Sequence, residues 1–165
     1  MTEVDSSNDE VALSFAITSY GWADVSLRVG SETFNIEGVS YTGDGLGGLV
    51  RFALGLVVGE AVAECSFDLE PAEIRLRGVS DSVTVHLSVY KFADGYSDNS
   101  ISEEARVLYT TCRIATLGRA VSRTAEAVLS EHGLEGYKAV WCDDFPSRAL
   151  AALKAALAAQ LEGLG

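Results

Sequence analysis

The residues best suited to chemistry form a glycine-rich turn with the sequence Gly-Asp-Gly-Leu-Gly-Gly. Gly43, Gly45 and Gly48 match the G-x-G-x-x-G spacing of dinucleotide-binding turns, in which glycines let the backbone approach a pyrophosphate at a helix N-terminus. Glu64 stands about where a ribose-binding acid would be. Asp44, however, would place a negative charge beside the pyrophosphate, and the preceding strand alternates instead of being apolar throughout. The spacing therefore leaves open a nucleotide site or a tight turn that packs a helix on a sheet.

Histidine and cysteine offer the other routes to catalysis. His86 lies on the outward side of a predicted strand, where a general base would still need an orienting partner and a pocket. Cys65, Cys112 and Cys142 stand far apart without a C-x-x-C pair, which is typical of reduced thiols and not of a disulfide framework or zinc site. Cys112, expected on a helix, and Cys142 could be nucleophiles beside a histidine, but no cysteine-enzyme signature surrounds them. We therefore predict no catalytic residue, no cofactor and no metal ligand.

Charge is unevenly distributed along the chain. The 165 residues include 24 acids and 12 bases, a formal net charge of −12, and residues 1–104 hold 18 of the acids but only 5 of the bases. Such an excess of acid disfavours nucleic acid binding, because phosphates require clusters of Lys and Arg. It permits a basic protein partner, although solubility alone would also explain it. The side chains predicted to contact such a partner are Glu64, Asp68, Glu70 and Glu73.

Residues 11–92 are predicted to form mainly strands around one inserted helix. Apolar and polar residues alternate repeatedly in this region, most clearly at residues 83–90, and this alternation is typical of half-buried strands. From Asp44 the apolar spacing changes to i, i+3, i+4 and i+7, which predicts a helix. Asp44 would be its N-cap, and Gly59 would lie just past its end.

The remaining third is predicted to be helical. Ser100 and Glu103 match the S-x-x-E capping box, which predicts a helix that ends at Gly133. Its apolar positions are Val107, Ile114, Leu117, Val121 and Val128. After a short irregular passage, a last helix begins near Asp144. Its apolar stripe consists of Leu150, Leu153, Leu157, Leu161 and Leu164.

Together these elements predict an α+β fold: an antiparallel sheet of about six strands, one inserted helix and two C-terminal helices. Residues 1–10 are predicted to be a disordered acidic tail, and residues 11–165 a single domain. The first ten residues contain no apolar segment of the kind found in signal peptides, and the longest apolar stretch, Leu49 to Val58, is interrupted by Arg51. That stretch is also too short to span a membrane, so we expect a cytoplasmic protein without a membrane partner.

Three short patterns resemble those of small bacterial proteins of unknown function. They are W-x-D-V from Trp22, S-Y-x-x-D-x-L-x-x-L from Ser40, and the Glu70-Pro71 pair. The resemblance covers residues 22 to about 90. It implies that the second pattern is a strand end that caps the following helix, in agreement with the expected role of Asp44, and it implies no particular activity.

Three hypotheses about function follow. The charge asymmetry favours a non-catalytic protein-binding module, such as an immunity- or antitoxin-like inhibitor of a basic partner. The second is a small-ligand or nucleotide-binding protein, or an enzyme, that uses the Gly43–Gly48 turn or His86. The third is a structural or assembly module joined through the C-terminal leucine helix.

Overall fold

The computed structural model describes residues 10–95 and 99–163 and shows seven strands and three helices. A three-stranded antiparallel sheet has the order β1-β2-β3, and a four-stranded one has the order β4-β5-β6-β7. The strands are β1 (Val11–Ser19), β2 (Trp22–Val29), β3 (Glu32–Ser40), β4 (Val62–Asp68), β5 (Glu73–Asp81), β6 (Thr84–Phe92) and β7 (Arg106–Arg113). The helices are α1 (Gly45–Val57), which follows β3 and precedes β4 in the chain, and the C-terminal α2 (Ile114–Trp141) and α3 (Ser147–Glu162). The predicted α+β class is confirmed, with two sheets in place of one.

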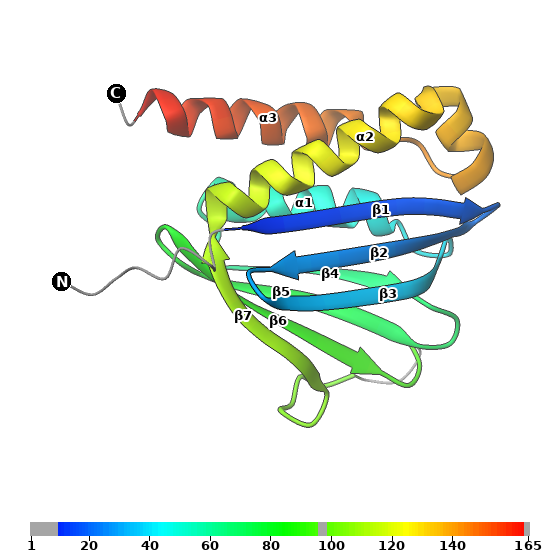
Figure 1. Cartoon of the computed structure of the whole chain (residues 1–165), viewed down its shortest axis with the longest axis horizontal. Coiled ribbons are helices and arrows are strands. Elements are labelled where there is room, and N and C mark those ends of the chain that lie inside the picture. The colour runs from blue at the N-terminus through cyan, green and yellow to red at the C-terminus, as the bar shows by residue number, and fades with distance from the viewer. Residues whose placement is uncertain (1–9, 96–98, 164–165) are drawn as a thin grey trace.

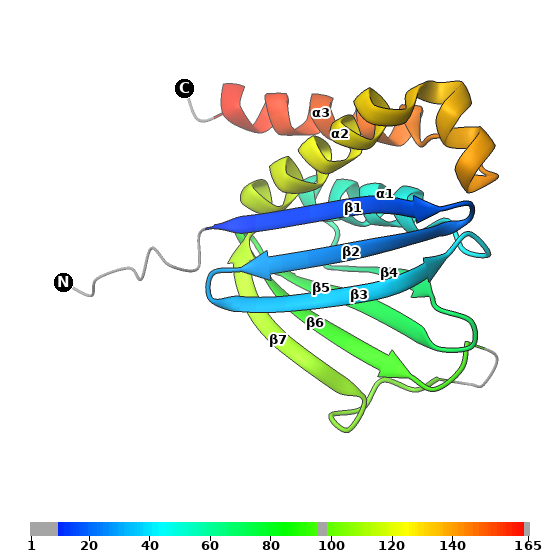
Figure 2. The same cartoon turned by 45° about the vertical axis from the view of Figure 1, so that its right-hand side comes forward.

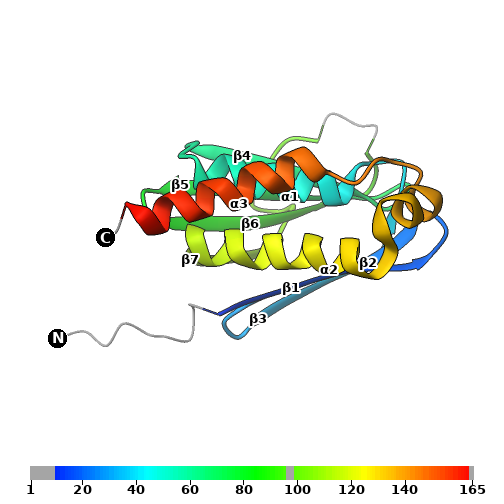
Figure 3. The same cartoon turned by 90° about the horizontal axis from the view of Figure 1, so that it is seen from above.

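The two sheets face each other across an apolar interior, and the helices lie along one side of the pair (Figures 1 and 2). Side chains from both sheets meet in this interior, among them Leu27 of β2 and Leu76 of β5, with Leu49 of α1 and Leu117 of α2 closing it. Seen from the helix side, α2 runs beside β1, and α1 and α3 lie towards the four-stranded sheet (Figure 3). Within the parts of the chain that the structure describes, no helix has the length and apolar character needed to cross a bilayer.

The segment of residues 106–113 is a strand, so the helix predicted to follow the capping box is wrong there. β7 pairs with β6 over its whole length, with Leu87 opposite Thr110 and Val85 opposite Cys112. Ser102 accepts a hydrogen bond from the Ala105 amide at 3.3 Å, but this closes a turn and not a helix. The helix begins only at Ile114.

The two C-terminal helices also differ in detail from the prediction. Gly133, with φ 70° and ψ 171°, interrupts the helical backbone as expected, but the passage after it is helical up to Trp141. α3 begins close to the predicted position. Its leucine stripe is buried only at Leu150 and Leu153, whereas Leu161 is 65% exposed, and Leu164 lies outside the described residues. Residues 1–9 of the predicted tail lie outside them as well.

Candidate functional site

The glycine-rich turn opens α1 as the sequence predicted. The Asp44 carboxylate accepts a hydrogen bond from the Gly47 amide at 3.0 Å, and the Arg51 guanidinium donates to its other oxygen at 3.2 Å. The helix ends at Val57, and Gly59 follows with φ 101°. Asp44 is therefore the N-cap of α1, and its carboxylate takes up the amide that a bound anion would use.

The glycines of this turn bring α1 close to β4. A Cβ atom on Gly45 would lie 3.1 Å from the Phe67 ring, and one on Gly48 would lie 3.7 Å from the Cβ of Cys65. An adjacent cavity of about 170 Å³ has Asp68 and Glu73 in its wall. Negative charge there repels a phosphate group. This geometry fits helix packing better than a pyrophosphate site.

The four acids predicted to contact a partner all have partners within the chain. Glu64 accepts from Arg77 at 2.6 Å, directly across the strand pair, and Glu73 accepts from Arg75 at 2.9 Å. These two ion pairs compensate part of the negative charge of β4 and β5 within the molecule itself.

Asp68 and Glu70 belong to a polar network at the end of β4. Asp68 accepts from the Thr42 hydroxyl and from the Glu70 amide, the latter at 3.1 Å. Glu70 accepts from the Ser40 hydroxyl at 2.7 Å, and Ser40 is fully buried. The network fastens the end of β3 to the turn between β4 and β5, and the Ser40 and Glu70-Pro71 patterns therefore meet in space.

The outward side of the four-stranded sheet has a different character. Its central residues form cross-strand rows: Val62, Val79 and His86 in one, and Glu64, Arg77, Ser88 and Tyr109 in the next. α1 packs on the opposite side of this sheet, where Cys65 and Phe67 point inward. We call the residues Val62, Glu64, Arg77, Val79, His86 and Tyr109 the outer β4–β7 face. Its apolar members are well exposed, at 42% for Val62, 41% for Val79 and 51% for Tyr109.

Tyr109 is held in place at one side of this face. The His86 ring stacks on it with a centroid separation of 6.2 Å, and His86 Nδ1 lies 2.9 Å from the tyrosine hydroxyl oxygen. The guanidinium of Arg106 lies 5.0 Å from the centre of the tyrosine ring. The hydrogen-bond partner of His86 is thus a phenol on an open sheet surface. The sequence patterns place Tyr109 and Arg106 in a helix and therefore indicate no role for either residue.

The cysteines lie apart from one another, as their spacing predicted. Cys65 and Cys112 are buried, and desolvation raises the pKa of both thiols, that of Cys112 to about 12. Cys112 belongs to β7 and not to a helix. Cys142 is exposed, and its thiol donates a hydrogen bond to the Tyr20 hydroxyl at 2.8 Å. Nowhere in the described part of the chain do three His, Cys, Asp or Glu side chains gather as metal ligands would.

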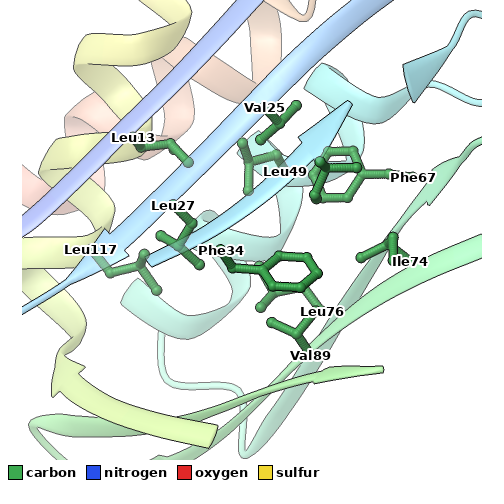
Figure 4. Close-up of a pocket in the computed structure, with 11 residues that line it drawn as sticks. Leu13, Val25, Leu27, Phe34, Leu49, Phe67, Ile74, Leu76, Val89 and Leu117 are labelled. Carbon is green, nitrogen blue, oxygen red and sulfur yellow. The ribbon is translucent and has the colours of Figure 1, made fainter. Parts of the chain in front are cut away.

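The interior between the sheets contains an apolar cavity (Figure 4). Its walls include Leu27, Phe34, Leu76, Val89 and Leu117, and its volume is about 20 Å³. That volume holds about one water molecule, and a cavity with only apolar walls stays dry. A ligand of ordinary size would fit only if the sheets moved apart.

Comparisons of this chain with protein family models, with curated proteins and with solved structures find no match.

Proposed function

We propose that this chain is a non-catalytic protein-binding module whose contact surface is the outer β4–β7 face. The observation that carries this proposal is the fixed, half-exposed Tyr109. Tyrosine and arginine dominate the binding energy of protein interfaces, and a side chain that is already ordered loses little entropy when a partner covers it. His86 and Arg106 supply that order here, by a stacked contact and a cation–π contact respectively.

The margin of this face at β4 supports a partner with basic groups. Glu64 and Asp68 are the charged residues of β4, and both carry negative charge. Their hydrogen-bond and ion-pair partners within the chain reduce the negative potential around both carboxylates, but the carboxylates remain at the β4 margin of the sheet. An acidic protein that covers a basic partner is typical of an immunity- or antitoxin-like inhibitor, and we place this function in the bacterial cytoplasm.

Affinity capture with matched tyrosine variants tests this function. Tagged wild-type protein is incubated with lysate of the native host, in parallel with Tyr109→Ala and Tyr20→Ala. Tyr20 is the control, because it is also an exposed tyrosine with a hydrogen-bond partner. It lies in the turn between β1 and β2, away from this face. We expect a stoichiometric partner with wild type and with Tyr20→Ala, and at least about 10-fold less with Tyr109→Ala, as for an interface hot spot. Equal capture by all three proteins would exclude the outer β4–β7 face as the binding surface.

A further inference from the structure

The outer side of the four-stranded sheet is electrically divided across its strands. β4 and β5 contain four acids and two arginines, a net charge of −2, and the acids of β4 are Glu64 and Asp68. On the outer side, β6 and β7 contribute Arg106 and Arg113 and no acid, a net charge of +2. Lys91 lies opposite the buried Ile74 and therefore belongs to the inward side. One margin of the face is therefore negative and the opposite margin positive, although the chain as a whole is acidic.

We propose that a second copy of this chain covers the outer β4–β7 face when no other partner is bound. This inference rests on the proposed function, because it names a molecule that occupies the same face. A surface with opposite charges at its two margins is complementary to itself, because a two-fold axis can place each margin over the other.

Only one of the simple two-fold arrangements brings opposite charges together. If the axis runs parallel to the strands between two facing sheets, β4 of one copy lies over β7 of the other. Glu64 then faces Tyr109 of the second copy, since both belong to one cross-strand row, and Arg106 of the second copy lies one row away. An axis across the strands would instead lay β4 over β4 and β7 over β7.

A dimer formed by pairing of sheet edges would also bring like charges together. If β7 added to β7 of a second copy in antiparallel fashion, Arg106 would approach Arg113 across the new strand pair. Like charges directly opposite each other destabilise a strand pair. The face-to-face arrangement also covers the exposed side chains of Val62, Val79 and Tyr109, whereas an edge-to-edge dimer would leave them in water.

Sedimentation velocity on the full chain tests this proposal. We expect wild type at about 1 to 100 μM to show a concentration-dependent monomer–dimer equilibrium. Above about 0.1 M, where the long-range repulsion between two copies of net charge −12 is already screened, further salt should weaken it, because the Debye length falls from about 10 Å at 0.1 M to about 3 Å at 1 M. Glu64→Arg and Arg106→Glu should each weaken dimerisation at least about 10-fold, since each places like charges across the interface. Tyr109→Ala should weaken it as well, and Tyr20→Ala should not.

Mixing the two charge variants provides the decisive measurement. In a mixed dimer, the arginine introduced by Glu64→Arg in one copy meets the glutamate introduced by Arg106→Glu in the other. At the second, symmetry-related contact the unchanged Glu64 and Arg106 meet. Both contacts are then attractive, and dimerisation should return to within about threefold of wild type.

Circular dichroism of each variant separates loss of assembly from loss of fold. A monomeric wild type, or a dimer indifferent to these substitutions, overturns the second-copy proposal.

The two proposals fail separately. A wild type that stays monomeric but captures a host protein through Tyr109 overturns only the second copy as occupant. A wild-type dimer that responds to the charge variants but captures nothing overturns only the heterologous partner.

Discussion

At the scale of single residues, Asp44 links the turn to the helix that follows. Its carboxylate accepts from the Gly47 amide and from Arg51, so it supplies the acceptor that the first turn of α1 needs. Replacing it by Ala should lower the free energy of unfolding by about 1 kcal/mol, the usual effect of losing an N-cap. Urea denaturation measures this change. Glu37→Ala removes an exposed acid without a capping role and should leave the midpoint nearly unchanged; an equal loss in both variants would contradict the capping role.

The three thiols should differ sharply in reactivity. Burial raises the pKa of Cys65 and of Cys112, the latter to about 12, so near neutral pH both are thiols and not the nucleophilic thiolate. Cys142 is exposed. A chromogenic disulfide reagent should therefore label one cysteine rapidly in the native protein and all three after unfolding. Cys142→Ser should abolish the rapid phase; a rapid phase that persists in this variant would show that a buried strand opens readily.

At the scale of elements, the crossing of the three helices depends on Gly118. A Cβ atom there would lie 2.9 Å from Cγ2 of Val57 and 3.1 Å from Cδ2 of Leu157, both closer than ordinary van der Waals contact. Gly118→Ala should therefore lower the melting temperature, because α1 and α3 must shift to admit a methyl group. Gly136→Ala, in the same helix, meets only His132 at 3.8 Å and should raise stability by up to about 1 kcal/mol through helix propensity. If both substitutions stabilise, the helices are packed less closely than the structure shows.

Strand β7 is the element whose secondary structure the sequence patterns predict wrongly. Its inward positions include the polar Thr110 and the small Cys112, both buried, while Val107 and Tyr109 are exposed. Apolar residues therefore occur on both sides of β7, so the strand lacks a clear alternation, and the seven-residue spacing from Val107 to Ile114 indicates a helix instead. The strand's content of Val, Tyr and Thr, all common in strands, is the signal that favours the correct structure. By contrast, α1 and β4 to β6 follow their patterns, because one side of each faces the interior.

At the scale of the whole molecule, the distribution of charge could not be derived from the chain order alone. The sequence places acids mainly before residue 105, but strand register decides which charges meet. Arg77 lies opposite Glu64, and the arginines of β7 lie at the other edge of the sheet from the acids of β4. The outer β4–β7 face can be identified only from the structure, in which β7 belongs to the sheet and Tyr109 lies beside His86.

The net charge of −12 should make stability depend on salt. Repulsion among like charges opposes the compact state, and salt screens it. Raising NaCl from about 0.01 to about 0.15 M should therefore raise the melting temperature by a few degrees, about 2–4 °C for each kcal/mol in a chain of this size. The double variant Glu32→Lys/Glu37→Lys changes the charge by two at each site, from −12 to −8, and should show a smaller salt response. A melting temperature that falls with added salt would mean that the ion pairs outweigh the repulsion.

The contact between α2 and β1 has a consequence for the timing of synthesis. Thr124 donates a hydrogen bond to the carbonyl of Leu13 at 3.0 Å, although 111 residues separate them. Translation at about 5–20 residues per second leaves an interval of roughly 5–20 s between the appearance of the strand and that of the helix covering its edge. During that interval the edge of the nascent β1–β3 meander at β1 is uncovered, and another strand could add to it. A chain that stalls on the ribosome before residue 124 should therefore depend on chaperones, and full-length chains released from it should not.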